Sequence, residues 1–94
     1  MKTKTFETFY ELSDFLSENK DVFKGSPIKG FIDAVHKIRS TGCGSCKKRN
    51  IDIALSTYQN LLDVLTEIDK ENIKNLLDVD TVIFTFKGNP MFKI

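Results

Sequence analysis

Two cysteines and one histidine are the residues of this sequence whose types and spacing could do chemistry. Cys43 and Cys46 lie three residues apart within RSTGCGSCKKRN, residues 39–50, and His36 precedes Cys43 by seven residues. A Cys-x-x-Cys pair can be a redox couple, half of a metal site, a disulfide, or two small apolar side chains in a tight turn. The residues around the pair indicate which of these four roles the cysteines have.

A thiol oxidoreductase is disfavoured by the segment that comes before the pair. Thioredoxin-like enzymes place Cys-x-x-Cys at a helix start after a β-strand and supply a cis-proline later in the fold. Here the preceding segment has helical spacing, and neither Pro27 nor Pro90 stands before a strand that could face the cysteines. A structural disulfide is disfavoured because the sequence indicates a reducing compartment.

A zinc site would need more ligands than the motif supplies. Zinc commonly takes four ligands, and this chain offers Cys43, Cys46 and, with less support, His36. Two chains could pool their cysteine pairs at the tips of helical hairpins, a layout similar to the zinc hooks of certain coiled-coil DNA-repair ATPases. The preferred interpretation is structural, because Gly42 and Gly44 permit a tight turn between helices. We therefore expect no cofactor, with zinc as the alternative.

Three consecutive basic residues, Lys47, Lys48 and Arg49, follow the second cysteine. Adjacent residues of a helix point in different directions, so the run does not form one groove-reading face. Cations near a helix N-terminus are electrostatically unfavourable, which indicates compensation by the acidic segment, a partner protein or a phosphate. No aromatic residue interleaves with the run, so base stacking is poorly supported. We assign the run to partner contact.

The charge pattern along the chain is uneven although the net charge is only +1. Residues 25–49 carry net +5 and residues 50–80 carry net −5. If these segments form neighbouring antiparallel elements, their charges can offset each other within the fold. We prefer that interpretation to a nucleic-acid partner.

Enzymatic activity is not expected from this residue inventory. The sequence has no glycine-rich phosphate loop and no catalytic triad pattern, and its single histidine leaves little for acid–base catalysis. No apolar run reaches the roughly 20 residues that span a bilayer. Glu7, Glu11 and Asp14 interrupt the N-terminal segment, so it does not read as a signal peptide. We expect no membrane association and a location in the cytoplasm of the producing cell, with the virion as the alternative.

The length of 94 residues predicts a single domain over residues 1–94. Apolar spacing predicts helices over about 5–20, 26–42, 45–68 and 69–78, with Thr5, Ser26 and Asp69 as candidate N-caps. Alternation in TVIFTF, residues 81–86, followed by the turn KGNP, predicts a C-terminal β-hairpin. KTKT, residues 2–5, alternates without an apolar face and gives only weak support for a strand. The predicted fold is α+β and mostly helical: an antiparallel helical hairpin with flanking helices and a C-terminal β-hairpin.

Surplus apolar residues lie off the main stripe of the long helix. Ile53 and Val64 do not align with the core-facing positions of residues 45–68, so we predict that they contact another subunit or partner. On the hairpin, Val82, Phe84 and Phe86 are predicted to share one apolar face, which Phe92 and Ile94 resume after the turn. Two open strand edges would then invite pairing with a neighbouring chain.

The glycine–cysteine–lysine motif carries a resemblance to a known group of proteins. Its residues are Gly42, Cys43, Gly44, Cys46, Lys47 and Lys48. Followed by a long amphipathic helix and a short β ending, this motif resembles small tailed-bacteriophage proteins, many with a Gly-Cys-Gly-x-Cys-Lys-Lys loop before a helix. The resemblance covers about a quarter of the chain and implies a phage-encoded virion or accessory component that binds other proteins. It assigns no catalytic role.

Taken together, these observations predict a non-enzymatic, protein-binding structural or adaptor subunit that forms homo- or hetero-oligomers. The alternative is a small zinc-linked regulator of nucleic-acid machinery, in which the Cys-x-x-Cys pair holds the metal.

Overall fold

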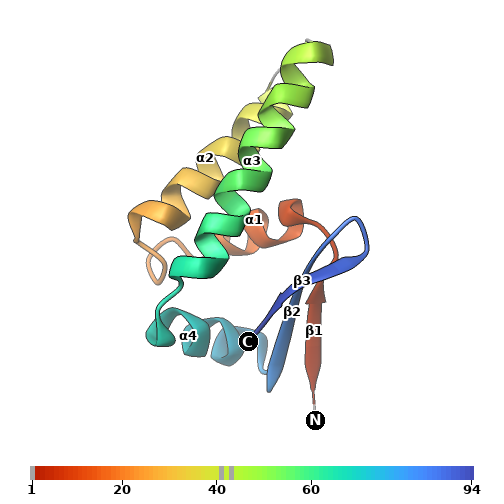
Figure 1. Ribbon diagram of the computed structural model, residues 1–94. Helices are drawn as coiled ribbons and strands as arrows, with labels where there is room; N and C mark the ends of the chain where they lie inside the picture. Colours follow the sequence, from red (N-terminus) through yellow and green to blue (C-terminus); the bar gives the residue numbers. More distant parts are fainter. Residues whose placement is uncertain (1, 41, 43) are drawn as a thin grey trace.

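A three-stranded sheet forms one side of the molecule in the computed structural model, which describes residues 2–40, 42 and 44–94 (Figure 1). The strands are β1 (Thr3–Phe6), β2 (Thr81–Phe86) and β3 (Asn89–Lys93), in the order β1-β2-β3. β1 is parallel to β2, and β3 is antiparallel to it. The predicted C-terminal hairpin is confirmed, but β2 is a central strand. The two-stranded sheet expected from the sequence is therefore wrong, because β1 occupies one edge of β2.

Four helices complete the fold: α1 (Phe9–Glu18), α2 (Ser26–Ser40), α3 (Gly44–Val64) and α4 (Glu67–Leu77). They lie between β1 and β2 in the sequence, so all four separate two strands that are neighbours in space. The α+β class with mostly helical content is confirmed. Among the described residues, no helix combines the length and the apolar character needed to cross a bilayer.

The pairing of α2 with α3 gives the predicted antiparallel helical hairpin. α2 begins at Ser26, whose side chain lies outside the described part, and the Lys29 amide donates to the Gly25 carbonyl over 3.0 Å. The facing sides of the two helices are buried. They comprise Ile28, Phe31, Ala34, Val35 and Ile38 from α2, and Ala54, Tyr58, Leu61 and Leu62 from α3. Helical spacing predicts all of these positions except Ala34.

Threonine side chains cap two of the helices at positions that differ from the predicted ones. The Thr8 hydroxyl, not that of Thr5, accepts from the Glu11 amide at the start of α1. Thr66 caps α4 in a reciprocal box, with Asp69 as its third helical residue and not as the cap. This capping box ends the predicted continuous helix over 45–68, and Ile68, placed on its core stripe, is 72% exposed.

Aromatic rings fill the core where the hairpin meets the sheet. The rings of Phe31 and Tyr58 stack with centroids 5.6 Å apart, and those of Phe6 and Phe84 stack at 5.7 Å. Phe9 packs against the first pair, with its ring centroid 6.4 Å from that of Phe31 and 6.1 Å from that of Tyr58. β1 thus belongs to the fold through one buried ring, that of Phe6, which is 2% exposed.

The alternation of β2 breaks at its fifth residue. A register irregularity lies between Phe84 and Thr85, and both side chains are buried, whereas strict alternation would place Thr85 on the face opposite Phe84. Val82 and Phe84 are fully buried as predicted, whereas Phe86 is only half-buried. Partly buried Phe92 and Ile94 pack against the core, as does Met91.

Candidate functional site

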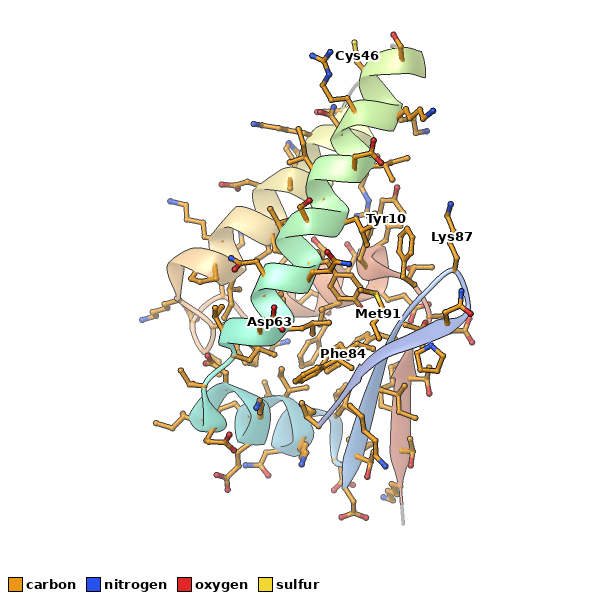
Figure 2. The ribbon with its side chains drawn as sticks, viewed as in Figure 1. Tyr10, Cys46, Asp63, Phe84, Lys87 and Met91 are labelled. Carbon is orange, nitrogen blue, oxygen red and sulfur yellow. The ribbon has the colours of Figure 1, made fainter. Side chains whose placement is uncertain are left out.

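The end of the helical hairpin projects away from the sheet and from α4 (Figure 1). The first six residues of α3, Gly44–Arg49, are all exposed, and none contributes a side chain to the core. Cys46 lies at this projecting end, as its label in Figure 2 shows. Burial therefore contributes little to holding this end of α3.

Basic side chains from both helices gather at the projecting end. Lys37 and Arg39 lie in the last turn of α2, and Lys47, Lys48 and Arg49 follow the start of α3. All five are exposed. The antiparallel hairpin explains this gathering, because it sets the end of one helix beside the beginning of the next.

Arg39 is set apart from the other basic residues by its contacts with α1. Its guanidinium donates to both carboxylate oxygens of Asp14, over 2.7 and 3.3 Å, and lies 5.2 Å from the centre of the Tyr10 ring. These hydrogen bonds hold the pKa of the Asp14 carboxyl below its usual value. Arg39 thus links α2 to α1 through this ion pair.

The acidic segment lies beside the basic one only in part, because α3 packs against α2 whereas α4 lies beyond the hairpin. Asp63 is near the opposite end of α3 from Cys46 (Figure 2), and α4 with its acidic residues follows beyond it (Figure 1). Over residues 2–40, 42 and 44–94, the three ion pairs are Lys2–Asp78, Arg39–Asp14 and Lys70–Glu67. The antiparallel arrangement that the preferred interpretation of the charge pattern required is present in α2 and α3, but none of these three ion pairs joins the basic segment to the acidic one.

The candidate zinc ligands are not assembled by the described residues. Cys43 lies outside the described part of the chain. His36 is exposed on α2 and lines a groove of about 320 Å³ with Asp14 and Ser17 of α1, to which Cys46 does not contribute. Among the described residues, no group of three or more His, Cys, Asp or Glu side chains is placed to hold a metal ion.

Ile53 and Val64 point into solvent, 48% and 45% exposed. Their separation of eleven residues puts them within about 20° around α3 but about 16 Å apart along it. Asn60, between them on this face, is exposed and polar. The two side chains are thus accessible to a partner, as predicted, but they do not form one continuous apolar patch.

A small aromatic groove, absent from the sequence prediction, lies between α1, α3 and the β2–β3 turn. It has a volume of about 200 Å³, and its walls are Thr8, Phe9, Tyr10, Ile51, Phe86 and Lys87. Phe9 forms its base, with its ring centroid 4.7 Å from that of Tyr10 and 5.8 Å from that of Phe86. Tyr10 and Lys87 flank it in Figure 2. We call these six residues the aromatic groove.

One cation stands at the rim of the aromatic groove. The Lys87 ammonium lies 5.5 Å from the centre of the Phe86 ring. Lys87 and Gly88 both have positive φ, 51° and 82°, as a two-residue type I′ hairpin turn requires. The turn geometry therefore fixes where this charge stands. The sequence showed the turn but gave no signal that Tyr10 and Ile51 would face it.

Comparisons of this chain with protein families, with curated proteins and with solved structures find no significant match.

Proposed function

We propose that this chain is a non-enzymatic protein-binding subunit, and that its aromatic groove receives a peptide segment of the partner. The observation that carries the proposal is the groove itself. Half-buried Tyr10, Ile51 and Phe86 leave an apolar concavity whose lining is almost free of polar surface. Exposed aromatic rings around a concavity are typical of the residues that dominate protein interfaces.

The positive charge at the rim indicates which kind of peptide segment the aromatic groove would bind. Lys87 stands at the rim, with its ammonium 5.5 Å from the centre of the Phe86 ring. A volume of about 200 Å³ suits one large apolar side chain. The expected segment therefore presents one large apolar side chain next to an acidic residue. The non-enzymatic part of the proposal rests on the residue inventory of the sequence, and the virion or accessory setting rests on the bacteriophage resemblance.

The test is a selection of random displayed peptides against the full chain. We expect enriched peptides to share a large apolar residue beside Asp or Glu, and to lose at least about tenfold in affinity for Ile51→Ser. Lys87→Asn should weaken them about threefold, since asparagine tolerates the positive φ while removing the charge.

Ile53→Ser is the matched control. It lies two residues along α3, on the opposite side of the helix, and makes the same chemical change at an exposed position. Thermal melts of all variants show that each is folded. Selected peptides that bind Ile51→Ser as tightly as the unchanged chain, or the absence of any enriched peptide, would overturn the proposal. Loss of binding in Ile53→Ser alone would move the site to the outer face of α3.

A further inference from the structure

Positive charge is concentrated at one end of this molecule to a degree that its net charge hides. Residues 35–51 contain five basic residues and no acidic one, whereas the rest of the chain has nine basic and thirteen acidic residues, net −4. Arg39 is engaged with Asp14. We call the remaining four cations, Lys37, Lys47, Lys48 and Arg49, the basic tip.

The basic tip opposes the local stability of the fold. Lys47, Lys48 and Arg49 are consecutive and lie near the positive end of the α3 dipole, and α3 has no acidic residue in its first turn. No side chain of Gly44–Arg49 is buried to offset this cost. Within the described residues, no ion pair balances any of these four cations. An anionic partner outside the chain would relieve the repulsion.

From this arrangement we infer that the basic tip binds the phosphate backbone of duplex DNA without reading its sequence. Lys47, Lys48 and Arg49 follow one another at about 100° around α3, so together they span about 200° of its circumference. Such a set cannot read base edges from one face, but it can reach phosphates on both sides of a groove. Because α2 packs against one side of α3, only the outer side of this helix, which is about 10–12 Å across, can face a major groove about 12 Å wide.

An acidic protein surface fits this arrangement less well. A protein docked against one side of α3 would meet one or two of the cations and leave the others unbalanced. The phosphates that line a groove lie on both sides of an inserted helix. The rest of the chain carries net negative charge, so phosphates repel it and attract the basic tip. This polarity favours an orientation in which the tip approaches the DNA first. This inference is independent of the proposed peptide groove, which lies on the body of the molecule.

The experiment titrates the full reduced chain into a labelled mixed-sequence DNA duplex of about 20 base pairs and follows the fluorescence anisotropy. The dissociation constant is measured at several NaCl concentrations from about 50 to about 200 mM. Four phosphate contacts predict a log–log salt slope of about −3 to −4. The variant Lys47→Gln/Lys48→Gln/Arg49→Gln should lose at least about tenfold in affinity at the lowest salt and flatten the slope to about −1.

The matched control is Lys20→Gln/Lys24→Gln/Lys29→Gln. It changes the net charge by the same amount at exposed positions near the start of α2, the opposite end of the hairpin. This control should stay within about twofold of the unchanged chain at each salt concentration. Circular dichroism and thermal melts confirm that both triple variants are folded.

Four outcomes would overturn the inference. The first is no binding at the lowest salt, and the second is an equal loss in both triple variants, which would reduce the effect to net charge. The third is tighter binding of polyglutamate than of duplex DNA, lost in the tip variant, which would assign the tip to an acidic protein. Equal affinity for duplex RNA, whose major groove is too narrow for a helix, would overturn the groove geometry.

Discussion

The Tyr58 hydroxyl donates a hydrogen bond to the main-chain carbonyl oxygen of Thr85 over 3.1 Å, and both residues are buried. The Thr85 hydroxyl in turn lies 2.9 Å from the Phe6 carbonyl oxygen and 3.0 Å from that of Glu7, to which it donates. The pairing of β1 with β2 ends at Phe6 and Phe84. Side-chain hydrogen bonds of Tyr58 and Thr85 therefore join α3, β2 and the end of β1 beyond the last paired residues of the two strands.

Removing the Tyr58 hydroxyl should destabilise the fold without displacing the ring. In Tyr58→Phe the Thr85 carbonyl loses its side-chain donor in a buried setting, so we expect a loss of about 1–2 kcal/mol in the free energy of unfolding. Urea denaturation followed by circular dichroism measures it. Tyr10→Phe, at a half-buried position, is the control and should change stability by less than about 0.5 kcal/mol. Equal stability of Tyr58→Phe and the unchanged chain would contradict this role.

Stability should also fall at alkaline pH because of the same residue. Burial raises the pKa of Tyr58 above its usual value. In the unfolded chain the phenol ionises near pH 10, while the folded chain keeps its proton, so the unfolded state binds fewer protons above that pH. The Tyr58 contribution is complete below about pH 10 and declines as the pH rises further.

Urea midpoints measured from about pH 8 to about pH 11 test this dependence. Lysines titrate in the same range, so only the part of the decline that is absent from Tyr58→Phe belongs to Tyr58. Parallel pH profiles of the two proteins would show that the phenol contributes nothing.

The hairpin of α2 and α3 and the strand β2 could be predicted because local signals and burial agree there. Ser26 and Pro27 mark the start of α2, and the apolar residues that follow all face the core. Val82 and Phe84 alternate as a half-buried strand should. In these elements, the apolar residues recur along the sequence with the same spacing as the buried positions.

Other features depend on contacts that local patterns do not contain. β1 has one buried side chain, Phe6, and exists as a strand because it pairs with β2, 78 residues away along the chain. The break between α3 and α4 lies at residues 65–66 and not at 68/69 as predicted, because Leu65 and Ile68 extend the apolar spacing across it. The sequence Thr66-x-x-Asp69 was the available signal for that break. The aromatic groove has no local signal, since α1, α3 and the β2–β3 turn each supply part of it.

Deleting residues 90–94 should destabilise the fold by about 2–4 kcal/mol. The deletion removes half-buried Met91, Phe92 and Ile94, and it takes away most of the strand that pairs with β2. Thermal melting measures the loss, and Lys93→Gln, an exposed change in the same strand, is the control. We also expect weaker association with any strand-pairing partner at this edge, measured by sedimentation. A deleted chain that melts and assembles like the full chain would contradict both expectations.

Changing both cysteines to serine should leave the fold intact. Cys46 is exposed at the projecting end of the hairpin, so Cys43→Ser/Cys46→Ser should cost less than about 1 kcal/mol of stability. Chemical denaturation under reducing conditions measures this, and metal analysis of both proteins purified without added zinc accompanies it. Stoichiometric zinc in the unchanged chain that disappears in the double variant would establish the zinc-linked alternative, with the cysteine pairs of two chains as the simplest ligand set.

The outer face of α3 offers a separate test of assembly. Ile53 and Val64 are each nearly half exposed, so Ile53→Glu/Val64→Glu should keep the helical circular-dichroism signal and change stability by less than about 1 kcal/mol. If this face contacts another subunit, burying two carboxylates there is costly, and the variant should sediment as a smaller species than the unchanged chain. Gln59→Glu, at an exposed position about 120° around α3 from Ile53, is the charge control. A monomeric variant that unfolds would instead place both residues in the core, and identical sedimentation of all three proteins would remove this face from assembly.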